Sequence, residues 1–512
     1  MWVVKTFRRS LFLKNAAVLT VTSLLLRAVG IFFRIYLAGR IGAEGMGLYQ
    51  LVISVYVLAS AFAAAGICTA VTRQVTDALC RGDRSTALKA LRCAVGVSVA
   101  VGLASAAVLY LAADPVSRWF LKDVRAVNAL RVLTVSLPFM GVSSCLKGYF
   151  MARRRVTFTA RAQLLEQAVR IGVIALLLDR VGPSDLASAC AVVMLGDVVA
   201  EVAACLHLAL GFGRDRRTLP AGTAPPAMGV MTTLMGIALP ISASRYVNTA
   251  LHTVENLLVP DRLSRYTGSR AVALAQFGSL KGMAMPLLFF PASFLSSIAT
   301  LLIPEISESA ALGRQERVKA AVGRTLHLTL CASILIGGVF YLYAEELGRL
   351  LYNSDEVALM LRVLAPLVPA MYLESMVDGI LKGLGQQVSS LRYSVIDSAL
   401  RLLLVVTLVP RTGMAGFLFV MTVSNLLVAF LNLHRLLTVT EMHLKWRQWI
   451  FAPLAAVGLA AVGAEFLPRI APLATLPAPV PLAVGIALLC GMYALLLLAF
   501  GCVTRRDLTI NV

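Results

Sequence analysis

The amino-acid sequence predicts an all-α polytopic membrane protein from its composition, its apolar runs and an internal repeat. Of its 512 residues, 59% are hydrophobic and only 14% are charged. A soluble domain carries about 45–50% apolar residues and about 25% charged residues. The composition therefore excludes a soluble enzyme, a disordered chain and a collagen-like fibre, and it favours helices that lie in a bilayer.

About fourteen membrane-spanning helices are expected, because a hydrocarbon core about 30 Å thick needs about 20 apolar residues per helix. The fourth, fifth and eleventh segments contain charged residues that must be buried. In chain order the segments are 16–39, 46–71, 91–113, 126–150, 164–180, 187–212, 229–259, 272–303, 320–344, 357–384, 391–410, 413–437, 448–468 and 478–502.

The first segment follows a basic N-terminus, as the apolar region of a signal peptide would. It has no cleavage site of small residues, and it contains Arg27. We therefore expect a membrane span that is retained in the mature protein.

Lysine and arginine are concentrated in alternate loops, and such loops are retained on the cytoplasmic side. Roughly 28 basic residues lie on the side of the N-terminal tail and roughly 11 on the other side. This bias predicts that both termini are cytoplasmic, which requires an even number of spans. The basic clusters lie between apolar runs rather than on one solvated face with aromatic residues, so the net charge of +21 does not predict a nucleic-acid partner.

The chain also repeats itself. The string LRVLTVSLP at 130–138 recurs 231 residues later as LRVLAPLVP at 361–369, and LKG at 146–148 recurs at 381–383. The offset of 231 also relates Arg161, Glu166 and Arg170 to Arg392, Asp397 and Arg401. Three ordered blocks predict two homologous six-helix halves followed by two further helices.

Six spans per half give both halves the same orientation in the membrane. Transporters built from such parallel repeats bind their substrate between the repeats, near the bilayer midplane. The expected divisions are a cytoplasmic N-terminus (1–15), a six-helix bundle (16–212), a cytoplasmic linker (213–228), a second bundle (229–437), a cytoplasmic loop (438–447), two accessory helices (448–502) and a cytoplasmic tail (503–512).

Charged residues inside spans point to a substrate site. Inserting one at the centre of a span costs about 2.5–3.5 kcal/mol, and such residues normally face a bundle interior or a watery cavity. Two helices carry them on one face, and we expect these faces to oppose each other across a central cavity. The alternative to substrate binding is, for Arg34, that its side chain extends to the outer membrane interface. For Arg27 the alternative is a structural role. The two faces are Ser23, Arg27, Gly30 and Arg34 in the first span and Arg245, Asn248, His252 and Glu255 in the seventh.

Lys281 lies early in the eighth span, five residues before Pro286. Proline inside a span is tolerated where the helix lines a cavity. A cavity lined by three arginines and this lysine, with Glu255 as the nearby acid, is cationic and favours an anionic ligand. Arginine binds phosphate through two parallel hydrogen bonds and lysine binds it as a point charge, so a diphosphate head is a good match.

Acidic residues inside spans are candidates for proton or cation coupling. Asp197 and Glu201 lie four residues apart without a basic neighbour on their helix, and Glu374 and Asp378 have the same spacing. The alternative for Asp378 is an ion pair with Lys382. Two further charged sets are related by the repeat, and we expect each to form ion pairs within its own helix. They are Arg161, Glu166 and Arg170, and Arg392, Asp397 and Arg401.

Cofactors, metals and catalytic residues are not expected. The nine cysteines are scattered without a CxxC pair or a Cys/His spacing suited to a metal. No loop is long enough for a catalytic domain and no nucleophile and base share a suitable spacing, so an enzyme is not expected.

Two long stretches carry a family resemblance that extends over essentially the whole chain. They are SLLLRAVGIFFRIYLAGRIGAEGMGLYQL at 23–51 and, within 238–309, ALPISASRYVNTALHTVENLLVPDRL and GMAMPLLFFPASFLSSIATLLIPEISES. They resemble the stage V sporulation protein B family of the multidrug/oligosaccharidyl-lipid/polysaccharide (MOP) superfamily. This resemblance implies a fold like that of multidrug (MATE) exporters and MurJ-type lipid II flippases, in the cytoplasmic membrane of a bacterium.

The MurJ-type flippases carry R-x-x-G, a second arginine and R-x-F-G in their first helix. Arg27 to Gly30, Arg34 and Arg40 to Gly42 stand in similar places. Lys281 resembles a cavity arginine of the eighth helix. The arginine of the second helix has no counterpart here, which implies a less basic cavity.

We therefore expect a flippase that moves a polyprenyl-diphosphate-linked sugar, such as the peptidoglycan precursor lipid II for cell wall or spore cortex, by alternating access. Its partners would be the anionic lipid-linked oligosaccharide, membrane lipids and cell-wall synthases. The alternatives are a cation-coupled multidrug exporter of the MATE type and a non-transporting scaffold of a wall-synthesis complex.

Overall fold

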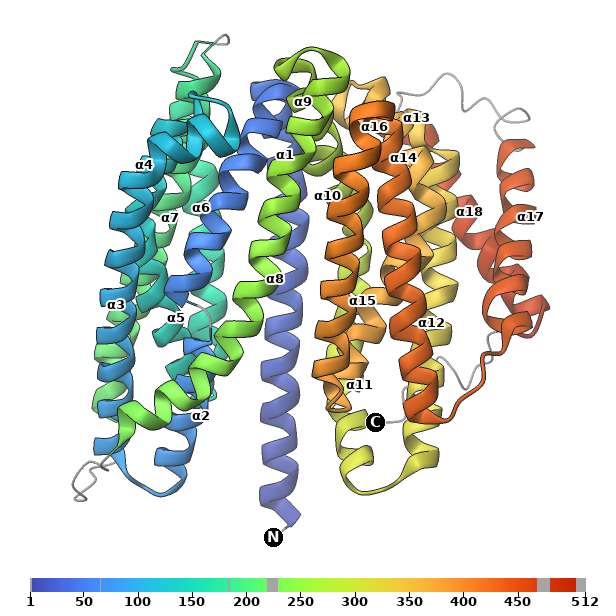
Figure 1. Ribbon diagram of the computed structural model, residues 1–512. Coiled ribbons are helices and arrows are strands. Elements are labelled where there is room, and N and C mark those ends of the chain that lie inside the picture. Colours follow the sequence, from blue (N-terminus) through green and yellow to red (C-terminus); the bar gives the residue numbers. More distant parts are fainter. Residues whose placement is uncertain (1, 65, 183–184, 219–228, 467–478, 503–512) are drawn as a thin grey trace. The chain divides into compact units, whose positions relative to one another are not determined.

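The computed structural model describes residues 2–64, 66–182, 185–218, 229–466 and 479–502, and its regular elements there are helices (Figure 1). The predicted tail 503–512 and most of the linker 213–228 lie outside the described residues. The all-helical prediction is confirmed. The chain forms two compact units, Met1–Asp261 with Arg270–Gly278, and Arg262–Ser269 with Ser279–Val512, which we call the first and second units.

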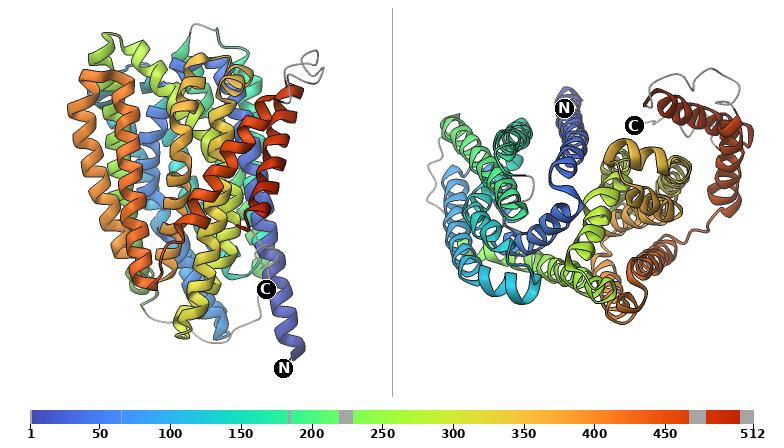
Figure 2. Two further views of the ribbon diagram at one scale, coloured as in Figure 1. Left: turned by 90° about the vertical axis from the view of Figure 1, so that its right-hand side faces the viewer. Right: turned by 90° about the horizontal axis from the view of Figure 1, so that it is seen from above.

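The first unit is built from long helices that lie side by side (Figures 1 and 2). Its elements are α1 (Trp2–Ala64), α2 (Ile67–Cys80), α3 (Arg84–Pro115), the π-helical turn η1 (Val116–Leu121), α4 (Ala126–Thr134), α5 (Ser136–Ala152), α6 (Val156–Leu178), α7 (Leu186–Asp215), the 3₁₀ turn η2 (Arg216–Thr218), most of α8 (Val230–Thr267) and α9 (Arg270–Phe277).

The second unit contains the end of α8 and then continues from the π-helical turn η3, whose first residue still belongs to the first unit. Its elements are η3 (Gly278–Ala284), α10 (Met285–Phe289), α11 (Ala292–Ala311), α12 (Gln315–Leu342), α13 (Ala344–Tyr352), α14 (Asp355–Leu364), η4 (Ala365–Leu367), α15 (Val368–Gly383), α16 (Gln387–Thr440), η5 (Arg447–Phe451), α17 (Ala452–Phe466) and α18 (Pro479–Ala499).

Ten helical stretches in the described residues are long and apolar enough to cross a membrane, or eleven if α4 and α5, bent by 42°, form one span. This count is lower than the predicted fourteen for two reasons. The stretches Thr20–Cys80 and Gln387–Thr440 hold 61 and 54 residues and each counts once. In addition, α6 carries Arg161, Glu166 and Arg170 and is too charged to count.

Each of these two long stretches contains a sharp break at a glycine. Gly42 in α1 has a φ of 67°, and Gly413 in α16 has a φ of 64°. Residues with a side chain rarely adopt this left-handed region, so glycine is the residue that allows the break.

The cores of the two units consist of interlocking apolar side chains. Tyr149 and Phe150 of α5 are fully buried in the first unit, in a cluster with residues of α2, α3, α7 and α8. In the second unit, α11, α12, α15 and α16 enclose a cluster that includes Trp449. Small residues allow close approach where helices cross, as at Gly47, where an added Cβ would lie 2.1 Å from the carbonyl oxygen of Leu274.

The first unit extends well beyond the predicted linker at 213–228, because α8 packs on α1 and α2. Gln74 donates a hydrogen bond to the carbonyl oxygen of Val230 at 2.8 Å, and Leu234 and Ala238 belong to the core cluster of α2, α3 and α5. The two six-helix halves stay a prediction, because they were inferred from a repeat in the sequence, whereas the two units are defined by contacts in space.

Candidate substrate site

The polar face of the first span contains two arginines that have no partner among the residues described. Arg27 is exposed and Arg34 is half-buried, and neither forms an ion pair or a side-chain hydrogen bond with the residues described. A Cβ added at Gly30, between them, would have no atom within 4 Å. Arg40 differs, because it forms an ion pair with Asp179 at 3.0 Å. The helix therefore presents two uncompensated guanidinium groups beside open space.

Helix α8 packs antiparallel to the second part of α1. Thr253 donates a hydrogen bond to the carbonyl oxygen of Ser54 and Asn256 donates one to its Oγ, each at 3.1 Å. Further along, the rings of Phe62 and Tyr246 lie 4.6 Å apart. These contacts join α8 to the second predicted span. The opposition of the polar faces of the first and seventh spans therefore stays a prediction.

The polar face of α8 runs beside this contact. Arg245 is exposed, Asn248 is half-buried, and Glu255 is only 3% exposed. His252 places its Nδ1 at 3.8 Å from a carboxylate oxygen of Glu255. The acid of this face is thus buried while its arginine is accessible, so the accessible part of the face is cationic.

Lys281 belongs to the second unit and is half-buried in η3. Pro286 lies five residues later, at the start of α10, and has no N–H to donate to the preceding turn. A π-helical turn is one way in which a helix accommodates a missing hydrogen bond, and such turns are frequent at functional sites.

The candidate coupling residues of α7 have a basic neighbour that sequence spacing did not reveal. The Nε of Arg170 on α6 lies 2.5 Å from Asp197, and its other nitrogens donate to Glu166 at 2.9 Å and to Gln167 at 2.8 Å. The prediction that Asp197 lacks a basic neighbour holds only within its own helix. The predicted pair of Arg170 with Glu166 is present.

Glu201, one turn beyond Asp197, is 6% exposed. Lys147 of α5 lies 4.0 Å from Glu166 and acts electrostatically on Glu201. Lys147 and Arg170 thus face three carboxylates, those of Glu166, Asp197 and Glu201. With all five groups ionised, this buried cluster carries one excess negative charge.

The second unit holds a related network at the positions predicted by the repeat. Arg401 donates to Asp397 at 3.0 Å and to the hydroxyl of Ser424 at 2.6 Å, and Ser424 also bonds Asp397. Ser424 thus occupies the role that Asp197 has in the first unit. Because serine is neutral, the charges of Arg401 and Asp397 balance.

The second pair of candidate coupling residues is arranged differently. Asp378 forms an ion pair with Lys382 at 2.5 Å and accepts a hydrogen bond from Ser390. This is the alternative that the sequence left open. Glu374 is half-buried one turn earlier in α15.

Several polar residues of the first unit were not predicted. Ser54, Thr253 and Asn256 join α1 to α8, and Lys147 completes the buried charge cluster. Lys147 is part of the repeated LKG string, which was the one sequence feature that could have drawn attention to it. Among the residues described, no group of three or more His, Cys, Asp or Glu side chains could hold a metal ion.

Comparison with known proteins identifies the family to which the chain belongs. Residues 12–310 match the polysaccharide biosynthesis protein family, and residues 263–407 match the MatE family. The chain is 26% identical over 445 residues to stage V sporulation protein B of Bacillus subtilis (strain 168), covering 86% of each chain. It is 22% identical over 461 residues to the lipid II flippase MurJ of the same organism, covering 83% of each chain.

The fold is also found in a solved structure. An inward closed conformation of the lipid II flippase MurJ superimposes with a TM-score of 0.69 at 13% identity, covering 95% of this chain and 98% of that chain. The family match spans more than half of the sequence. This multi-pass membrane protein therefore belongs to the polysaccharide biosynthesis protein family.

Proposed function

We propose that the protein is a flippase that moves a polyprenyl-diphosphate-linked sugar, such as lipid II, from the cytoplasmic to the outer leaflet of a bacterial cytoplasmic membrane. The observation that carries the proposal is the pair of uncompensated arginines, Arg27 and Arg34, beside the open space at Gly30. Two guanidinium forks one heptad apart suit the oxygens of a diphosphate. A relative named as a lipid II flippase supports this substrate class.

The helix lengths support fourteen spans with both termini in the cytoplasm. At 1.5 Å per residue, Thr20–Cys80 would measure about 90 Å and Gln387–Thr440 about 80 Å, while one crossing needs about 30 Å. Counting each stretch as two spans and adding α6 raises eleven to fourteen. The alternation of basic loops then gives the orientation.

The remaining proposed binding groups are Arg245, Asn248, Glu255 and Lys281. In this proposal the arginines and the lysine attract the diphosphate, while Asn248 and Glu255 are hydrogen-bonding groups for the sugar. The lipid chain stays in the bilayer while the head crosses by alternating access between the two homologous halves.

The buried cluster of the first unit is the proposed coupling site. Its excess negative charge favours uptake of one proton or one cation. Lys147 and Arg170 form ion pairs with Glu166 and Asp197, so Glu201 is the carboxylate that we propose takes up this charge. In the second unit, Glu374 and Asp378 of α15 are the proposed coupling groups, and Asp378 pairs with Lys382.

A cation-coupled multidrug exporter is the second candidate function, since the carboxylate cluster of the first unit and the match to the MatE family both fit it. The two functions differ in the charge of their substrates. Proteoliposomes loaded with fluorescent lipid-linked oligosaccharide, and a parallel set with a cationic dye, separate them. Movement of the lipid with the dye unmoved supports the flippase, and the reverse result overturns it.

A further inference from the structure

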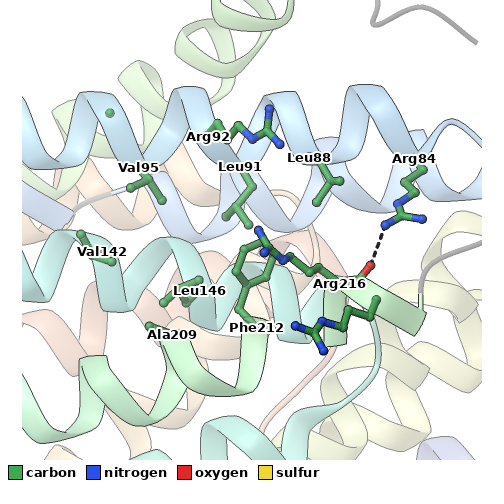
Figure 3. Close-up of a pocket in the computed structure, with 12 residues that line it drawn as sticks. Arg84, Leu88, Leu91, Arg92, Val95, Val142, Leu146, Ala209, Phe212 and Arg216 are labelled. Carbon is green, nitrogen blue, oxygen red and sulfur yellow. Dashed lines mark hydrogen bonds between the residues drawn. The ribbon is translucent and has the colours of Figure 1, made fainter. Parts of the chain in front are cut away.

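A cavity of about 600 Å³ opens in the first unit, away from the faces of α1 and α8 described above (Figure 3). It lies between α3, α5 and the end of α7 with η2. Four arginines and eight apolar residues line it, and in the described part of the chain no carboxylate does. The lining residues are Arg84, Leu88, Leu91, Arg92, Val95, Gly96, Val142, Leu146, Ala209, Phe212, Arg216 and Arg217.

Figure 3 shows Val95, Val142 and Ala209 toward one end of the cavity, Arg84 and Arg216 toward the other, and Arg92 between these ends. Arg84 donates a hydrogen bond to the backbone carbonyl of Arg216 at 2.9 Å. This bond ties the start of α3 to η2 and fixes the charged end of the cavity.

The two carboxylates next to these arginines in sequence are already engaged elsewhere. Asp83 caps α3 by accepting a hydrogen bond from the N–H of Thr86 at 2.9 Å, and the hydrogen bonds from Thr86 lower its pKa. Asp215 is buried, accepts a hydrogen bond from Tyr149 at 2.7 Å and pairs with Arg153 at 3.1 Å. The cavity therefore keeps a positive charge.

A second, apolar cavity of about 810 Å³ continues along α3 and shares Val142 with the first. It is lined by Val99, Leu103, Ala106, Ala107, Tyr110, Leu111, Thr134, Val135, Pro138, Phe139 and Val142. From Arg84 to Leu111, α3 rises about 40 Å. The two cavities thus follow one another along α3, the first lined by arginines and apolar side chains and the second mainly by apolar side chains, and we call the two together the track.

We propose that this track binds a lipid with an anionic phosphate head. The head lies among Arg84, Arg92, Arg216 and Arg217, and a hydrocarbon chain follows α3 through the apolar cavity. Basic pockets between membrane helices on the cytoplasmic side are suited to such heads, and the positive-inside rule places these arginines on that side. The inference does not depend on which substrate the protein transports.

A free phosphate would use only the charged end of the track, whereas a lipid would use both ends. Variants at the two ends therefore distinguish the two ligands. The Arg216→Gln, Arg217→Gln double variant removes two cations from the head site. Arg214→Gln, which lies outside the cavity at an exposed position of α7, is its control.

The first cavity can be filled, on its side toward the apolar cavity, without replacing an arginine. A Cβ added at Gly96 has no atom within 4 Å, so Gly96→Leu would project into the cavity without a backbone clash. Gly172 on α6 has the same open surroundings and lies outside the cavity, so Gly172→Leu is the matched control.

Native mass spectrometry of the detergent-solubilised full chain tests the proposal with three probes: phosphatidylglycerol, polyprenyl phosphate and glycerol phosphate. We expect at least one of the two lipids to bind, glycerol phosphate to bind weakly, and both the double arginine variant and Gly96→Leu to lower lipid binding about tenfold or more. Whichever lipid binds more tightly is then the better occupant of the track.

Two results would overturn the proposal. One is lipid binding that the double arginine variant and Gly96→Leu reduce no more than Arg214→Gln and Gly172→Leu do. The other is glycerol phosphate binding as tightly as both lipids, which would show a phosphate site without a role for the chain. Thermal unfolding of every variant identifies any loss of binding that comes from misfolding.

Discussion

At the scale of single residues, the membrane arginines divide into paired and unpaired groups. Arg170 and Arg401 reach carboxylates at about hydrogen-bonding distance and hold helices together. Arg27 and Arg34 reach no carboxylate among the residues described. A charge kept in a membrane without a partner is costly, so the unpaired group is the better candidate for binding a ligand.

Replacing a paired arginine should destabilise the fold. Arg170→Gln leaves Asp197 buried without its cation and Glu166 with Lys147 alone, and breaking a buried ion pair from one side costs about 3–5 kcal/mol. Thermal unfolding in detergent should show a lower midpoint for Arg170→Gln, with partial recovery on adding Asp197→Asn. Arg161→Gln, at an exposed position of the same helix, should change little. Equal effects of Arg170→Gln and Arg161→Gln would contradict a structural role for the pair.

At the scale of elements, the antiparallel contact of α8 with α1 sets the limits of the first unit. It depends on two hydrogen bonds to Ser54 and on the ring contact of Phe62 with Tyr246. Each hydrogen bond between membrane helices contributes little free energy, so the register of α8 against α1 should depend on several of these contacts together.

A double-mutant cycle on Ser54→Ala and Asn256→Ala tests this register. Because the two side chains share a hydrogen bond at 3.1 Å, we expect a coupling energy of about 0.6 kcal/mol and no more than about 1.7 kcal/mol. The control cycle pairs Asn256→Ala with Ser60→Ala, since Ser60 bonds the carbonyl of its own helix at Val57. Coupling of the same size in the control cycle would argue against the register.

Sequence patterns predicted the features that depend on short spacing. Composition and run length predict helices that cross a membrane, and spacing of four residues predicts the pairs of Arg170 with Glu166 and Arg401 with Asp397. The pair of Arg170 with Asp197 joins two helices, so spacing within one helix cannot predict it.

The limits of the first unit also depend on contacts between distant residues. The linker at 213–228 is a natural boundary by composition, yet α8 lies beyond it and packs on α1 and α2. Ser54 stands in a run of apolar residues and has no pattern that distinguishes it. Contacts of this kind follow from how whole helices pack.

At the scale of the whole molecule, the predicted topology places the two ends of α12 on opposite sides of the membrane. Arg314 precedes this helix and Glu346 follows it, and both are exposed. In a background without other cysteines, we expect a membrane-impermeant maleimide added to intact cells to label Glu346→Cys and to spare Arg314→Cys. Permeabilised cells should label both. The opposite pattern in intact cells would reverse the topology.

The transport of lipid-linked sugar through a cationic site is the central claim, and its most direct test is head-group movement in proteoliposomes. The wild-type chain should move a labelled polyprenyl-diphosphate sugar, and the Arg27→Ala, Arg34→Ala variant should lose at least about 90% of that rate, because each lost charge-assisted contact is worth about a factor of ten. Gly30→Leu, which fills the open space without changing charge, should also slow it. Arg118→Ala, at an exposed position of η1, should keep the wild-type rate.

The measurement contradicts the account if the double arginine variant, folded and inserted like the wild type, moves the lipid at the wild-type rate.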